Sequence, residues 1–184
     1  MNNAYIRTLF NIYSMDKLNN QLREKAISLG LCADWQGMWN ENWDNDKLAD
    51  MMYKGIDFCI KNRYPSKEFF LENFDLEFLR RRCIFVNDKR STNNPAQSLI
   101  LGRSDIKVRY NGYGSGVIFA LDNTSVTLTA KNRSFVIVHA FDNAVIKAEK
   151  FDVAKIVVLK HSPDVIVIAG EDVDVKEEYD YLKD

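Results

Sequence analysis

The sequence is poor in the residues that build disulfide-rich, metal-binding or unfolded chains. Its 184 residues include only three prolines, three cysteines and two histidines, while 46% of all residues are hydrophobic. This composition excludes a disordered chain, collagen and a low-complexity fibre. The length fits one large domain or two small ones.

The cysteines Cys32, Cys59 and Cys83 are far apart, form no CxxC pair and lie far from His139 and His161. Such spacing indicates neither a disulfide framework nor a zinc site, so we expect no metal and no cofactor. We interpret the three cysteines as small buried hydrophobic residues in a reducing compartment.

Neither charge is in excess, and no long apolar run occurs. The 25 Lys and Arg residues against 26 Asp and Glu residues give a net charge of −1, which does not favour nucleic acid or anionic lipid as a partner. The chain has no basic segment followed by an apolar core at its start and no window of about 18 apolar residues. We therefore expect no signal peptide, no membrane and a cytoplasmic location.

Up to about Val86 the apolar residues recur at helical spacing, which predicts a small helical domain over residues 1–86. One helix is expected around Leu18–Leu29, with Ser14 or Asp16 as its cap and Gly30 as its end. A second is expected over residues 46–62, and Ser66 and Asp75 are expected to cap two short helices.

The polar run over residues 87–97 is interpreted as a linker, because it buries little and resists regular structure. The repeats that follow are assigned to residues 98–175. The acidic residues 176–184 are interpreted as a polar cap or tail, since an open repeat end needs protection against strand pairing.

A ten-residue period runs through the second half of the chain. Residues ten positions apart form columns of similar character. Two of these columns are apolar and lie two residues apart, so the alternation of a strand places both on one buried face. A third column holds only residues that favour turns. The apolar columns are Ile106, Gly116, Val126, Val136, Ile146, Ile156, Ile166 and Val108, Ile118, Leu128, Val138, Ala148, Val158, Ile168; the turn column is Gly112, Asp122, Asn132, Asp142, Asp152, Ser162, Asp172.

A longer repeat of twenty residues favours a solenoid over an antiparallel meander or sandwich. The segment 120–124 returns as 140–144, whereas 130–134 lacks the Asp-Asn pair that both share. A coil of two strands and two turns fits this register. We predict an α+β fold, in which a small helical domain precedes a β-solenoid of three to four coils, and an antiparallel meander or sandwich is the alternative.

Several side chains are candidates for a binding site. Trp35, Trp39 and Trp43 would form an aromatic platform on one helix, although burial in the core is the favoured interpretation. Asp122 and Asp142 would stack along one solenoid edge, where a divalent ion ladder is conceivable but local turn bonding is favoured. Arg80, Arg81 and Arg82 could bind phosphate or an acidic partner, and a solvated helix face is the alternative.

Outward positions of the strands are unusually apolar, which indicates a partner, self-association or a cover of helices. The interface candidates are Val117, Phe119, Ile137, Val157, Leu159 and Val167. No phosphate loop, zinc-protease, hydrolase or kinase motif occurs, and neither histidine has an acid and a nucleophile nearby in sequence.

We therefore expect a non-enzymatic structural or interaction protein that binds a protein partner or itself. A glycan-binding or carbohydrate-active β-helix is the alternative, since such folds can carry paired carboxylates. A weaker alternative is an inhibitor of a host nucleic-acid enzyme, with the acidic tail as mimic.

The stretch Gly55–Phe74, followed by repeats of the Asp-Asn-Ala-Val type, resembles uncharacterised proteins of gut bacteria and their phages. These proteins pair a small helical segment with a short repetitive β region. The resemblance implies an architecture and a possible phage origin, with a virion as the alternative location, and it implies no activity.

Overall fold

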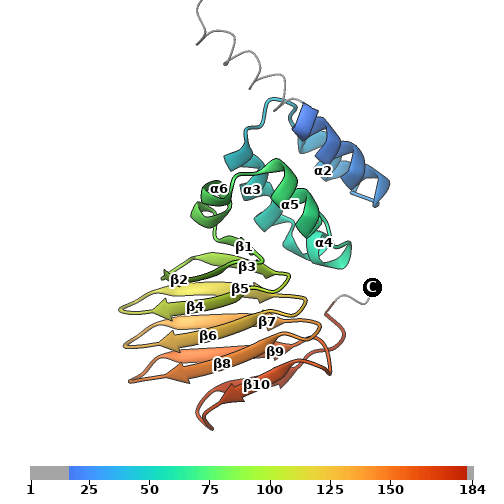
Figure 1. Cartoon of the computed structure of the whole chain (residues 1–184). Coiled ribbons are helices and arrows are strands. Elements are labelled where there is room, and N and C mark those ends of the chain that lie inside the picture. The colour runs from blue at the N-terminus through green and yellow to red at the C-terminus, as the bar shows by residue number, and fades with distance from the viewer. Residues whose placement is uncertain (1–16, 182–184) are drawn as a thin grey trace, which may run out of the picture. The chain divides into compact units, whose positions relative to one another are not determined.

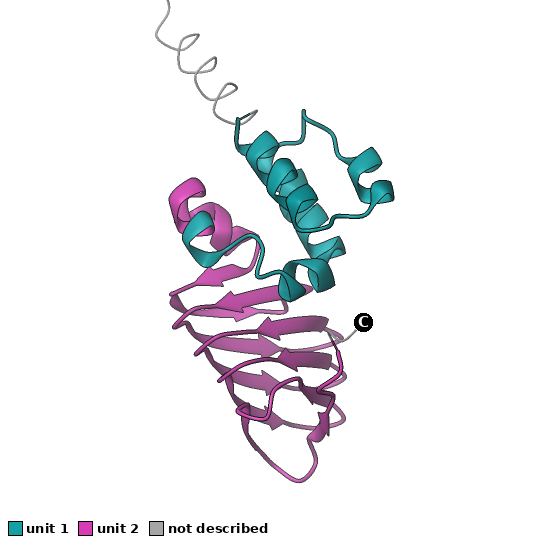
Figure 2. Cartoon of the chain, turned by 90° about the vertical axis from the view of Figure 1, so that its right-hand side faces the viewer, with its two compact units in different colours: residues 1–69 teal, residues 70–184 magenta. Residues whose placement is uncertain are grey.

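The computed structural model describes residues 17–181, which form an α+β fold with helices first and a β-solenoid of about four turns after them (Figure 1). The chain divides into two compact units, residues 1–69 and 70–184 (Figure 2). The predicted fold class is confirmed.

Six helices lie in the described part of the chain, and their bounds follow local capping. Asp44 and Asp75 accept hydrogen bonds from the backbone N–H of Lys47 and Phe78, and Ser66 accepts one from Phe69. The expected caps Ser14 and Asp16 lie outside the described residues. The helices are residues 17–28, α2 Ala33–Met38, α3 Asn45–Lys54, α4 Ile56–Lys61, α5 Lys67–Asn73, which spans the boundary between the units, and α6 Leu76–Arg81.

The single helix expected over residues 46–62 is wrong, because the structure has two helices there. Gly55 ends α3 by donating its N–H to the carbonyl of Met51, and it also begins α4. Glycine weakens a helix by about 1 kcal/mol relative to alanine, so a break at this residue costs little.

The solenoid consists of two parallel sheets, which excludes the antiparallel meander. Sheet A has the order β1-β3-β5-β7-β9-β11, and sheet B has the order β10-β8-β6-β4-β2. Strands alternate between the sheets along the chain, so one coil contains one strand of each. The strands are β1 Ile84–Val86, β2 Lys89–Asn93, β3 Gln97–Leu101, β4 Asp105–Tyr110, β5 Ser115–Ala120, β6 Ser125–Ala130, β7 Phe135–Ala140, β8 Val145–Lys150, β9 Lys155–Lys160, β10 Ile166–Ala169 and β11 Asp174–Glu177.

The buried core lies between the two sheets and follows the predicted columns. Ile106 pairs with Val126 and Val126 with Ile146 in sheet B, always twenty residues apart. Val136 and Ile156 pair in the same way in sheet A. These side chains are fully or almost fully buried, together with the small residues Ala120, Ala130, Ala140, Ala144 and Ala154 at the bends.

The corners of the coils depend on residues in the left-handed region. Gly102, Asp122 and Asp142 have φ of 72°, 61° and 54° at one corner, and Gly112, Asn132 and Asp152 have 67°, 59° and 58° at the other. Glycine, asparagine and aspartate tolerate this conformation best among the twenty residues. The prediction that the third column forms the turns is therefore confirmed.

The first corner also carries a ladder of hydrogen bonds between coils. Asp122 accepts the N–H of Gly102 at 2.7 Å, Asp142 accepts that of Asp122 at 2.8 Å, and Ser162 accepts that of Asp142 at 2.8 Å. At the second corner Asp152 accepts the N–H of Asn132 at 3.1 Å. These bonds give the turn carboxylates a structural role, so the geometry supports no divalent ion ladder.

The expectation that Ile166 and Ile168 continue the buried columns is wrong. Ile166 pairs with Val145 and Val167 with Ile146, so the register is twenty-one residues here. The turn Ser162–Val165 is one residue longer, and a shift by one residue moves every side chain to the opposite face. Val167, expected to face outward, instead packs against the core, while Ile166 and Ile168 are each 55% exposed.

The linker expected over residues 87–97 is also wrong, because β2 lies within it and pairs in parallel with β4. Its neighbour β1 pairs with β3. The solenoid therefore begins at Ile84 rather than at residue 98. Polar residues are compatible with a strand here because those of β2 are exposed or half-buried at the edge of sheet B.

The corner ladder predicts a large effect for Asp142→Ala and a small one for Asp142→Asn. Alanine would leave the N–H of Asp122 without its acceptor, at about 1–3 kcal/mol, and would add about 1 kcal/mol of backbone strain at positive φ. Asparagine keeps an acceptor and tolerates the conformation. Urea unfolding of both variants measures the difference, and equal stability would contradict the ladder.

Candidate functional site

The outer face of sheet A carries an apolar row along the solenoid. Val117 pairs with Ile137 and Ile137 with Val157, so three branched side chains stand in register on β5, β7 and β9. All three are half-buried. The outer face of sheet B differs, since its corresponding positions are Lys107, Thr127 and Lys147.

A cluster of five rings lies beside this apolar row, at the end of the strands. The aromatic cluster comprises Phe119, His139, Phe141, His161 and Tyr181. Phe119 stacks on His139 with ring centroids 5.0 Å apart, and His139 stacks on His161 at 5.2 Å. Tyr181 contacts His161 at 4.3 Å. Strand register places Phe119 beside His139, and Phe141 stacks on His161 of the next coil, whereas Tyr181 comes from the segment after β11.

The two histidines form a hydrogen-bonded chain to the C-terminal segment. His161 Nδ1 lies 2.7 Å from the carbonyl oxygen of Glu178 and so must carry a proton to donate. His139 Nδ1 lies 3.0 Å from His161 Nε2. When both rings are neutral, His139 donates to His161. When both are charged, two N–H groups face each other, so the chain of bonds requires at least one neutral ring.

Burial lowers the pKa of His161 below the ordinary value, while the hydrogen bond to the backbone of Glu178 and the charge of its side chain oppose that shift. The neutral ring is therefore the form that the fold favours. Sequence spacing offered a signal for this contact: a separation of twenty-two residues puts two side chains in adjacent coils of a twenty-residue period.

The interface candidates divide between this face and the interior. Val117, Ile137, Val157 and Leu159 are half-buried on the outer face of sheet A. Phe119 is only 4% exposed within the aromatic cluster. Phe119 and Val167 therefore do not offer the free apolar surface expected of them, and four of the six candidates remain.

The tryptophans do not form one helical platform, because α2 ends at Met38 and only Trp35 lies in it. Trp35 and Trp39 instead line an apolar cavity of about 250 Å³ within the first unit, residues 1–69, called here the helical unit. Trp43 lies next to Trp39, with ring centroids 5.7 Å apart. The cavity wall also contains Leu22, Leu31, Met51, Met52, Phe58 and Tyr64.

Asn19 holds this tryptophan segment and was not among the sequence candidates. Its side chain is completely buried. Its Oδ1 accepts the indole N–H of Trp39 at 2.6 Å, and its Nδ2 lies 3.0–3.1 Å from the carbonyl oxygens of Asn40, Glu41 and Trp43. A polar residue inside an apolar helical stripe was the available signal, since buried asparagine needs partners.

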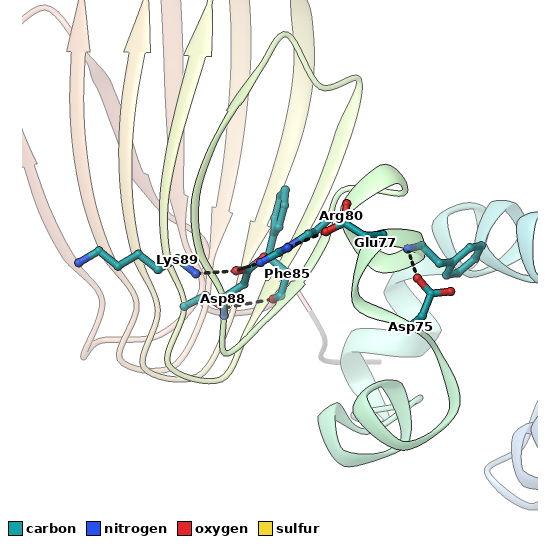
Figure 3. Close-up of polar contacts among 8 residues, drawn as sticks. Asp75, Glu77, Arg80, Phe85, Asp88 and Lys89 are labelled. Atoms are coloured by element: carbon teal, nitrogen blue, oxygen red, sulfur yellow. Dashed lines mark hydrogen bonds and ion pairs between the residues drawn. The ribbon is translucent and has the colours of Figure 1, made fainter.

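The arginine cluster is largely engaged within the solenoid unit. Arg80 donates to both carboxylate oxygens of Asp88 at 2.9 Å and to Glu77 at 2.7 Å (Figure 3). This pair lowers the pKa of the buried Asp88 carboxyl. Arg81 lies over the ring of Phe78. Arg80 thus connects α6 to the turn between β1 and β2, a structural role that competes with phosphate binding.

The cysteines do not all match the expected burial. Cys59 is buried, and burial raises the pKa of its thiol to about 12, whereas Cys83 is half-buried. Cys32 is exposed, so the expectation is wrong for this residue.

Within residues 17–181 no three His, Cys, Asp or Glu side chains are grouped as metal ligands would be. None of the helices described is both long and apolar enough to span a bilayer.

Comparisons with protein families, curated proteins and solved structures found no match to this chain. The resemblance to proteins of gut bacteria and their phages therefore stays an expectation.

The histidine chain predicts a stability that falls in acid. Because the pKa of His161 is lower in the fold than the ordinary 6.5, the unfolded chain binds more protons below pH 6.5, and unfolding is favoured as pH falls from there. His161→Gln, which can still donate to Glu178 but does not titrate, should flatten this dependence. Thermal unfolding of both proteins between neutral and mildly acidic pH measures it, and parallel curves would contradict the assignment.

Proposed function

We propose that the chain is a non-enzymatic interaction protein whose solenoid presents the outer face of sheet A to a protein partner. The observation that carries the proposal is the apolar row Val117, Ile137 and Val157, with Leu159 beside it. These residues stand on adjacent strands of one sheet, so their spacing is fixed by backbone hydrogen bonds.

A rigid apolar row favours protein binding for two physical reasons. Each side chain buried against a partner contributes hydrophobic free energy, and a preformed surface loses little conformational entropy on binding. The charged side chain of Lys155 is exposed at the start of β9, two residues before Val157, and can form part of a polar rim. Sheet B, with lysine and threonine at the matching positions, is suited to solvent.

A carbohydrate-active role is less well supported by the same geometry. Glycosidic cleavage needs two carboxyl groups that face a groove. Asp122 and Asp142 instead accept backbone N–H groups from the neighbouring coil. The acidic tail also has internal partners, since Glu177 pairs with Lys160, and the acidic Asp172 just before it pairs with Lys150. These contacts give mimicry of nucleic acid little support.

Site-specific photo-crosslinking tests the proposed surface. A photoreactive amino acid placed at Ile137, in cells that naturally contain the protein, should give one defined adduct of higher mass. The same amino acid at Thr127, which lies at a matching outer position of sheet B, should give none. The second substitution Val157→Lys should abolish the adduct at position 137, because a charge would interrupt the apolar row.

The result that would overturn the proposal is equal crosslinking from both sheets or none from sheet A. Circular dichroism and thermal unfolding of the Val157→Lys variant serve as the control, since an outward substitution should leave the fold intact.

A further inference from the structure

The two ends of the solenoid are built differently. At the first end, β1 follows α6 directly, and the Arg80–Asp88 pair joins that helix to the first turn (Figure 3). At the last end, β10 and β11 each pair with one strand only, β8 and β9. Among the strands that the structure describes, none pairs with the outer edge of either.

The outer edges of β10 and β11 therefore present unpaired backbone groups. Ile166 donates its N–H toward β8, to the carbonyl of Ala144, and Glu178 donates toward β9, to the carbonyl of Lys160. Because successive residues of a strand point their N–H and C=O groups to opposite sides, Val167, Ala169, Val175 and Glu177 point theirs toward the open end. Such an edge is a template for another strand.

Exposed apolar side chains occur at this end in both strands, although β11 also carries the charged residues Asp174, Lys176 and Glu177. Ile166 and Ile168 are 55% exposed and Val175 is 42% exposed. An edge strand that is meant to stay single normally carries charges, prolines or a bulge. In β10 none of the four residues is charged or a proline.

We propose that two copies of this chain join tail to tail through the outer edges of β10 and β11. A two-fold axis perpendicular to both sheets would pair β10 with β10 of the second copy and β11 with β11, each in an antiparallel manner. Ile168 lies three residues before Glu171 and Val175 three residues after Asp172, so the two residues lie across the last coil from each other. One axis can therefore pass beside both.

This register is complementary to itself. In sheet B, Val167 and Ala169 of one copy exchange hydrogen bonds with Ala169 and Val167 of the other, and the two Ile168 side chains meet on the outer face. In sheet A, Asp174 of each copy lies opposite Lys176 of the other, so opposite charges pair twice. Within one copy these two side chains are already an exposed pair at 3.6 Å.

The charges favour a second copy over an unrelated strand. A two-fold interface requires that each residue meet its complement in the same patch. Asp174 and Lys176 on either side of Val175 satisfy this requirement, and opposite charges directly across an antiparallel pair stabilise it while like charges destabilise it.

Light scattering after size-exclusion chromatography tests the assembly with the full chain. The wild-type protein should have the mass of a dimer that dissociates on dilution. Asp174→Lys and Lys176→Asp should each shift the mass to that of a monomer, because each sets like charges opposite one another. The double variant that exchanges the two charges should recover the dimer. Thermal unfolding of all four proteins controls for folding.

Disulfide trapping tests the register separately. In a Cys32→Ser background, Ile168→Cys should form a disulfide between copies, since facing residues of a non-hydrogen-bonded antiparallel pair are about 4.5 Å apart at Cα. Ile166→Cys is the matched control, because this residue is equally exposed but faces Gly170 of the second copy and should stay reduced.

A monomeric wild-type protein at every concentration would overturn the proposal, as would a dimer whose mass is unchanged in both single charge variants. The inference goes beyond the proposed function because it uses the end of the solenoid and not the outer face of sheet A. A dimer that persists in the Val157→Lys variant, with crosslinking at Ile137 lost, would separate the two surfaces.

Discussion

The solenoid depends on one constraint at its corners, where the backbone takes positive φ and an aspartate side chain accepts a backbone N–H from the neighbouring coil, as at Asp122, Asp142 and Asp152. Asp142 does both, with φ of 54° and a bond to the N–H of Asp122. The turn leaves backbone donors without strand partners, and the corner side chains satisfy them. Only a short side chain with an acceptor oxygen meets both needs, which explains why aspartate and asparagine recur at these positions.

The constant length of the coil has consequences for the surface. Because corners repeat every twenty residues in the central coils, the same outer position of each strand falls in a straight row, and a chemical property repeated in sequence becomes a continuous strip on the molecule. Val117, Ile137 and Val157 form an apolar strip in this way. The aromatic cluster has the same origin. Phe119 and His139 are register partners, and Phe141 and His161 occupy equivalent positions just after β7 and β9.

The period made the solenoid predictable, whereas features that break the period were not. The core columns were correct from Ile106 to Val158, because alternation and turn residues agree there. The predicted column was wrong at Ile166, because one additional residue in the preceding turn moves each side chain of β10 to the opposite face. The alternation within β10 is the same in either register, so it does not indicate which face is buried. Capping residues correctly predicted where several helices begin. The position of the Trp39 indole, however, depends on its hydrogen bond to buried Asn19, and local sequence patterns do not indicate a contact between residues so far apart.

The same additional residue explains why the last coil differs from the others. It moves Ile166 and Ile168 from the core to the surface in a strand that is also the edge of sheet B. A chain that only needed to end its repeat could place a charged residue at position 168, as β8 does with the register partner Lys147. Two exposed isoleucines beside unpaired backbone groups combine the features that normally promote strand pairing, and the alternating Asp174 and Lys176 on the other sheet limit which strand can pair. In the proposed dimer, apolar side chains thus supply the driving force at this end, while the charges restrict the partner to a surface with the opposite order.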